Sequence, residues 1–148
     1  RRQCTCTAAQ VHRYLARLSG PLLDRIDLHV EVPRPAADAV LGGAPAEPSA
    51  AVRARVLAAR ARAAARGAGR ADHPPPAGAG AWWPADAAAL ALVRAAAERL
   101  MLGARATTRV LRAARAIADL EGAYAVGPAH VAEAVRYRVL DRPPAPDA

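Results

Sequence analysis

Residues 18–32 read Leu-Ser-Gly-Pro-Leu-Leu-Asp-Arg-Ile-Asp-Leu-His-Val-Glu-Val, and this stretch decides how the fold is interpreted. Gly20 and Pro21 end any preceding helix, because glycine is conformationally permissive and proline lacks a backbone donor. Residues 22–25 suit a single helical turn that begins after Pro21. From residue 26 apolar and polar side chains alternate up to residue 32. This period of two predicts a half-buried strand.

Arg25 lies at the junction between the predicted turn and the predicted strand. A rigid junction of this kind can hold a long guanidinium group so that it points outward. A guanidinium held in that way usually meets an anion, because its planar fork matches carboxylate and phosphate groups. The sequence therefore predicts an anionic ligand for Arg25.

The charge balance points to polyanionic partners. All 21 basic residues are arginines, and the formal net charge is +8. This favours nucleic acid or nucleotide phosphates. A second interpretation stays open, because the sequence is crowded with Ala, Arg, Gly and Pro, and such bias can also reflect coding composition. The core is expected to be modest, since phenylalanine is absent and alanine buries little area.

The expected compartment is the cytoplasm. No apolar run approaches the ~20 residues that a membrane span needs. The first residues, Arg-Arg-Gln-Cys, do not lead into the apolar region of a signal peptide. Two cysteines one residue apart cannot make a disulfide framework. We therefore expect no membrane partner.

Beyond residue 48 everything patterned is helical. Apolar spacing and end signals predict helices over residues 49–66, 86–102, 104–121 and 128–140, besides one over 7–18 near the start. Thr7 and Ser49 are the expected N-caps. Residues 33–48 have four prolines and a Gly-Gly pair, which is typical of a linker.

The predicted helix over 104–121 has two distinct faces. One arc is apolar and contains Val110, Leu111, Ala114 and Ile117, whereas Arg105, Arg109 and Arg112 form the opposite face. Arg105 lies in the first turn, where a cation opposes the helix dipole. Either its stem packs against something or its charge meets an anion. Arg109 and Arg112 are candidate nucleic-acid contacts, and the alternative is an ordinary solvated arginine face.

Two stretches resemble one known family. Residues 22–27, Leu-Leu-Asp-Arg-Ile-Asp, resemble the segment of magnesium-chelatase-type AAA+ ATPases that carries the arginine finger. Residues 19–32 as a whole are similar to the ComM/YifB branch of that group, bacterial proteins linked to DNA processing. The resemblance resumes at residues 102–106, Leu-Gly-Ala-Arg-Ala, which look like the segment with the sensor-2 arginine. Gly103 replaces the usual serine there, which removes a good N-cap.

The resemblance implies a mostly α chain. Residues 1–33 would be the C-terminal end of an α/β AAA+ core, with a helix, a turn and one strand. Residues 34–48 would be a linker, 49–142 an all-helical lid of about four helices, and 143–148 a tail. Arg25 would be an arginine finger acting in trans on a neighbouring subunit, and Arg105 the sensor-2 residue that binds nucleotide.

The resemblance also implies cofactors and partners. The parent protein would use ATP and Mg²⁺, form a homo-hexameric ring and act on DNA as a motor or helicase in recombination or transformation. Cys4 and Cys6 would be half of a Zn²⁺ site, and incidental thiols are the alternative.

The pair Trp82-Trp83 could stack on bases or pin a loop onto the core.

This chain alone is expected to be inactive. It has no lysine, so it has no Walker A loop, and it has no apolar run ending in Asp-Glu that would hold Mg²⁺. Two alternatives to the DNA motor stay open. One is a basic helical DNA-binding module without ATPase activity, and the other is the ATPase subunit of magnesium chelatase in tetrapyrrole synthesis.

Overall fold

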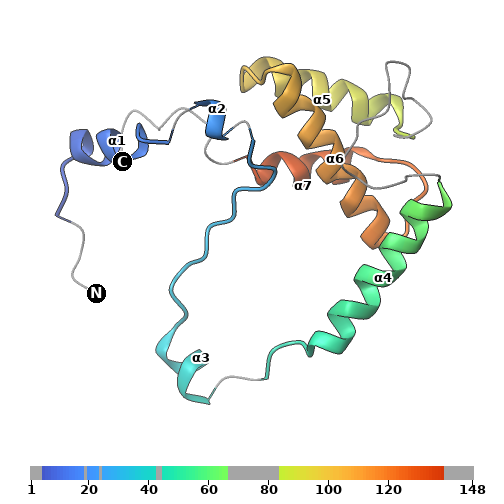
Figure 1. The fold of residues 1–148 in the computed structure, drawn as a ribbon, viewed down its shortest axis with the longest axis horizontal. Coiled ribbons are helices and arrows are strands. Elements are labelled where there is room, and N and C mark those ends of the chain that lie inside the picture. Colours follow the sequence, from blue (N-terminus) through green and yellow to red (C-terminus); the bar gives the residue numbers. More distant parts are fainter. Residues whose placement is uncertain (1–4, 19, 24, 43–44, 67–83, 139–148) are drawn as a thin grey trace.

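The computed structural model describes residues 5–18, 20–23, 25–42, 45–66 and 84–138. These residues are mostly helical, which confirms the predicted class (Figure 1). The helices that they form are α1 (Ala8–Leu15), α2 (Gly20–Leu23), α3 (Ala37–Gly42), α4 (Ser49–Ala65), α5 (Ala87–Arg99), α6 (Ala104–Glu121) and α7 (Pro128–Arg136).

The core lies between α5, α6 and α7. Its buried members are small, which lets the three helices approach closely; they are Ala89, Val93, Val110, Ala114, Ala118, Val126, Val131 and Ala134. Of the predicted apolar arc on α6, Val110 and Ala114 are buried, and Leu111 and Ile117 pack half-buried against the core. The buried members of this core are all alanine or valine, which agrees with the expectation of a modest core for the described residues.

Helix ends follow local capping chemistry. The Thr7 side chain accepts a hydrogen bond from the Gln10 backbone N–H at 3.3 Å, so the predicted cap of α1 is confirmed. The prediction for Ser49 is wrong, because Pro48 occupies the N-cap position and Ser49 is already the first helical residue. Asp86 caps α5 by accepting from the Ala89 N–H at 2.5 Å, so that helix begins one residue later than predicted.

The strand predicted for residues 26–32 is not formed, and no strand is present in the part of the chain that the structure describes. The four apolar side chains of this segment are 38–87% exposed. The physical reason is pairing, because a strand exists only when a neighbour satisfies its backbone groups. The segment instead lies against the end of α7, where the His29 N–H donates to the Tyr137 carbonyl at 2.8 Å.

Two helices lie away from the core. Helix α4 contacts α6 at one end only and projects from the bundle, and none of its residues is buried (Figure 1). Helix α1 also has no buried residue. Helix α3 is a short helix inside the predicted linker. None of the described helices combines the length and apolar character that a membrane span requires.

Candidate functional site

Arg25 follows the single turn of α2 and is exposed. Its backbone N–H donates to the Leu22 carbonyl at 2.9 Å, which closes the turn as the sequence predicts. The Arg25 side chain makes no hydrogen bond or ion pair with the residues that the structure describes. The guanidinium group is therefore available to an anion from outside this part of the chain.

The backbone just after Arg25 is attached to the helical bundle. Arg138 is 1% exposed, and its Nη1 donates to the Ile26 carbonyl at 2.6 Å. Asp27 forms an ion pair with Arg109 of α6. Together with the bond from His29 to Tyr137, these contacts hold residues 26–29 on the bundle.

Arg105 lies in the first turn of α6 and is exposed. Gly103, the N-cap, has no side chain to satisfy the free N–H groups at this end of the helix. Arg105 makes no side-chain hydrogen bond or ion pair with any described residue. The helix end thus presents unsatisfied N–H groups beside a cation, a combination suited to phosphate.

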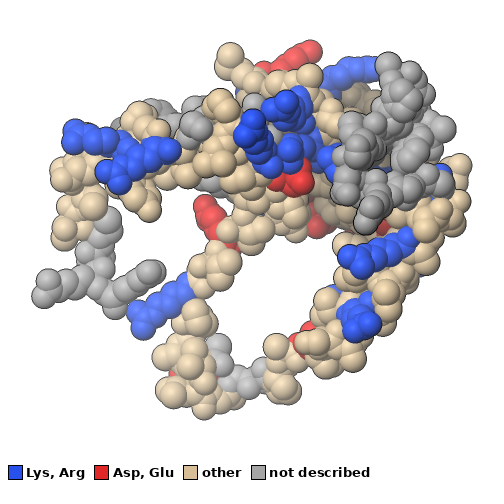
Figure 2. Space-filling model, viewed as in Figure 1, with Lys and Arg blue, Asp and Glu red and all other residues tan. Residues whose placement is uncertain are grey.

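Arg109 and Arg112, the two candidate nucleic-acid contacts on α6, have different surroundings. The Arg109 side chain is 17% exposed and is engaged by Asp27, so its charge is partly neutralised within the chain. Arg112 is half-buried. Basic side chains gather over the first part of α6 and along α4 (Figure 2). A nucleic-acid role for Arg109 and Arg112 stays a prediction.

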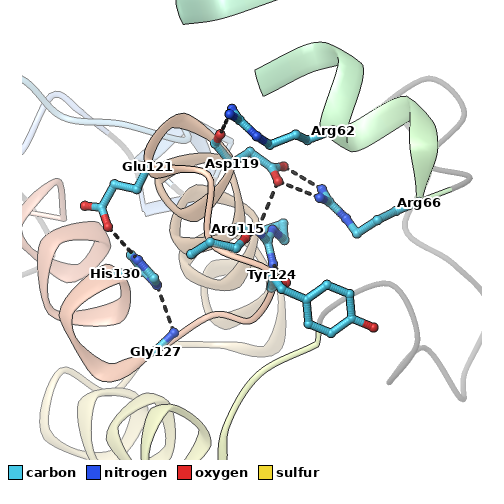
Figure 3. A network of polar contacts seen from close by, with 9 residues as sticks. Arg62, Arg66, Arg115, Asp119, Glu121, Tyr124, Gly127 and His130 are labelled. Carbon is cyan, nitrogen blue, oxygen red and sulfur yellow. Dashed lines mark hydrogen bonds and ion pairs between the residues drawn. The ribbon is translucent and has the colours of Figure 1, made fainter. Parts of the chain in front are cut away.

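Sequence reasoning missed a network centred on Asp119 of α6 (Figure 3). Arg66 donates to both carboxylate oxygens of Asp119, at 2.6 and 2.5 Å, and Arg115 donates to Oδ1 at 3.0 Å. Arg62 donates to the Asp119 backbone carbonyl at 2.8 Å. These bonds attach α4, which has no buried residue, to the bundle.

The same network secures the turn that follows α6. Arg115 also donates to the carbonyls of Ala123 and Tyr124, at 2.6 and 2.7 Å. Gly122 ends α6 in the left-handed conformation, with φ of +81°. A Cβ at this position would lie 3.3 Å from the Arg62 Nη2. Both the backbone conformation and the close guanidinium favour glycine here.

His130 is buried at the start of α7. Its Nδ1 accepts from the Gly127 N–H at 2.8 Å, so Nε2 carries the hydrogen and donates to Glu121 at 2.9 Å. This arrangement caps α7 and joins it to the end of α6 (Figure 3). His130 therefore has a structural role where α6 and α7 meet.

The predicted zinc ligands are only partly covered. Cys6 is exposed, and Cys4 lies outside the described residues. The described part of the chain contains no group of three side chains that could hold a metal ion. The half-site therefore stays a prediction. Trp82 and Trp83 also lie outside the described residues.

The sequence matches two family profiles. Residues 46–138 match the family described as "Magnesium chelatase, subunit ChlI C-terminal". Residues 1–40 match "Magnesium chelatase, subunit ChlI". No solved structure matches the chain.

Curated proteins with similar sequences come from several bacteria. "Uncharacterized protein YifB" of Escherichia coli is 36% identical over 147 residues, which cover 93% of this chain and 27% of that protein. "Competence protein ComM" of Haemophilus influenzae is 38% identical over 144 residues, covering 90% and 26%. An uncharacterized protein of Mycobacterium tuberculosis is 41% identical over 140 residues, covering 91% and 27%. The chain spans about a quarter of the length of these relatives.

Proposed function

The chain belongs to the magnesium chelatase ChlI family, and from this premise we propose that it is the C-terminal part of a longer ATPase of the ComM/YifB type. In this protein Arg25 is the arginine finger, which contacts the γ-phosphate of ATP bound by the neighbouring subunit of a ring. Arg105 contacts phosphate from the lid. The nucleotide and Mg²⁺ are held mainly by residues outside this chain, because it has no lysine for a Walker A loop.

The observation that carries the proposal is the state of Arg25. It is exposed and makes no polar side-chain contact with the described residues, while the backbone next to it is attached to the bundle. A guanidinium group on a firmly attached backbone loses little conformational entropy when it binds an oxyanion. Its planar fork also matches phosphate oxygens bidentately. A finger needs this combination of a charge without a partner among the described residues and a firmly attached backbone beside it.

The test is Arg25→Ala in the full-length protein. Turnover of ATP should fall by about 10³-fold or more, because an arginine finger stabilises charge that develops on the transferred phosphoryl group. Nucleotide affinity should stay nearly the same, since the finger belongs to another subunit. Arg94→Ala is the matched control, because Arg94 is an exposed arginine of α5. Turnover that survives in the Arg25→Ala protein would refute the assignment.

The substrate that we propose for the motor is DNA. The net charge of +8 supports a polyanionic partner, and one relative is named a competence protein. DNA should stimulate ATP turnover of the full-length protein, and rising salt should reduce this stimulation steeply, because phosphate contacts release counterions. Absence of stimulation at low salt would contradict the DNA role and would favour the magnesium-chelatase alternative.

A further inference from the structure

We propose that the lid sets the position of Arg25, and that Arg109 and Arg138 are positioning residues for it. The inference rests on the proposed function, because it concerns how the finger is held. It starts from three contacts that join residues 26, 27 and 29 to α6 and to the end of α7. All three lie within four residues of Arg25.

The contact from Arg138 is the most deeply buried of the three. Its side chain is 1% exposed, and it donates to the carbonyl of Ile26, the residue directly after Arg25. A buried guanidinium cannot swing freely, because its rotamers are limited by close packing. The carbonyl of Ile26 is therefore held at a fixed place on the lid.

The contact from Arg109 adds a charged attachment two residues after Arg25. Asp27 is 56% exposed at its side chain, but Arg109 is only 17% exposed, so one partner of the pair is rigidly placed. A single exposed ion pair holds a segment weakly. Combined with the contacts at Ile26 and His29, it further restricts the backbone that carries Arg25.

Helix α6 carries both Arg105, which contacts phosphate, and Arg109, which positions the finger. Arg105 precedes Arg109 by four residues on α6, a distance of about 6 Å along the helix axis. A phosphate group that draws Arg105 toward it moves α6, and α6 moves Asp27 through Arg109. The position of the finger is thereby linked to the phosphate that Arg105 contacts.

The test is Arg109→Gln in the full-length protein, with Arg94→Gln as the control. The kcat for ATP should fall by up to about 100-fold, because a displacement of ~1 Å at the reacting centre can cost that much. The KM and the nucleotide affinity should change little, since Arg109 touches no nucleotide in this account. Turnover is expressed per nucleotide-binding site, because a fraction of unfolded protein would also lower kcat without changing KM.

Two further variants keep the inference falsifiable. In the Arg25→Ala background, Arg109→Gln should have no additional effect, because the finger that it positions is absent. The exchange Asp27→Arg with Arg109→Asp should recover much of the lost turnover. If Arg109→Gln unfolds the lid, Asp27→Asn replaces it, since Asp27 is 56% exposed and its replacement should disturb the bundle little.

The outcomes separate this inference from the proposed function. Normal turnover in both Arg109→Gln and Asp27→Asn proteins, with Arg25→Ala inactive, would overturn the positioning role alone. An additive loss from Arg109→Gln in the Arg25→Ala background would also overturn it. An active Arg25→Ala protein would overturn the proposed function itself.

Discussion

Replacing Asp119 by asparagine should destabilise the bundle severely. Asp119 accepts three hydrogen bonds from Arg66 and Arg115 at its carboxylate, and its side chain is 7% exposed. Arg115 is also 7% exposed, and Arg66 is 17% exposed. The substitution removes the negative charge and leaves these buried guanidinium groups without a counter-charge.

The magnitude follows from burial. Removing one partner of a buried ion pair costs about 3–5 kcal/mol of unfolding free energy. We expect the lower end, about 3 kcal/mol, because Arg115 keeps its bonds to the carbonyls of Ala123 and Tyr124. In a chain of 148 residues such a loss lowers Tm by about 6–12 °C.

The assay is urea denaturation of the 148-residue chain followed by circular dichroism. The midpoint should fall without a change in the m-value. The matched control is Glu47→Gln, which removes an ion pair with Arg55 whose side chains are 43% and 58% exposed, and should cost less than about 1 kcal/mol. Hydrogen exchange should also rise in α4, because this network attaches it to the bundle. If Asp119→Asn is no more destabilising than Glu47→Gln, the reasoning about the network is refuted.

Two other substitutions test the packing. Gly122→Ala should lower the unfolding free energy by about 1–2 kcal/mol, because φ is +81° and the new Cβ would meet Arg62. Gly103→Ala, with φ of −67° and open space, should cost less, about 0.5 kcal/mol, because alanine is only a poorer N-cap than glycine; equal effects of the two in denaturant titrations would contradict this. Val110→Ala should cost about 2 kcal/mol, since two buried methyl-sized groups are lost from a side chain that is 1% exposed. A loss below about 0.5 kcal/mol would mean that the core is not packed around α6.

Much of the structure of helix α6 could be predicted from the sequence. Its bounds are visible because Gly103 and Gly122 flank a strongly periodic run, and the structure has the helix over Ala104–Glu121. The predicted apolar arc is correct but too narrow, since the buried face of α6 also includes Arg115, Ala118 and Asp119. The i,i+4 spacing of those two charges was a readable signal for an ion pair.

Contacts between distant residues could not be predicted. Arg109 faces away from the apolar arc, which is typical of a solvated residue, yet Asp27 reaches it from 82 positions away in sequence. Likewise Arg62 and Arg66 look like parts of a solvated helix until α4 meets the end of α6. Helical periodicity describes one helix at a time, and these partners are brought together only by tertiary packing.

The alternation over residues 26–32 is the instructive failure. Period-two patterning reports which side chains can share a face, but a strand forms only beside a partner that satisfies its backbone. The structure gives this segment contacts to α6 and α7 instead. The prediction that Arg25 is held beside a fixed backbone still agrees with its placement, because the lid provides the support that a sheet was expected to give.

The central claim is that Arg25 acts on a nucleotide held by a neighbouring subunit. The most direct measurement mixes full-length Arg25→Ala protein with a second variant whose nucleotide-binding loop, outside this chain, is disabled, and follows single-turnover ATP hydrolysis. Each protein alone should be inactive. In mixed rings the intact finger of one subunit meets the intact nucleotide of the other, so hydrolysis should return. No recovery in rings shown to contain both proteins would contradict an action between subunits.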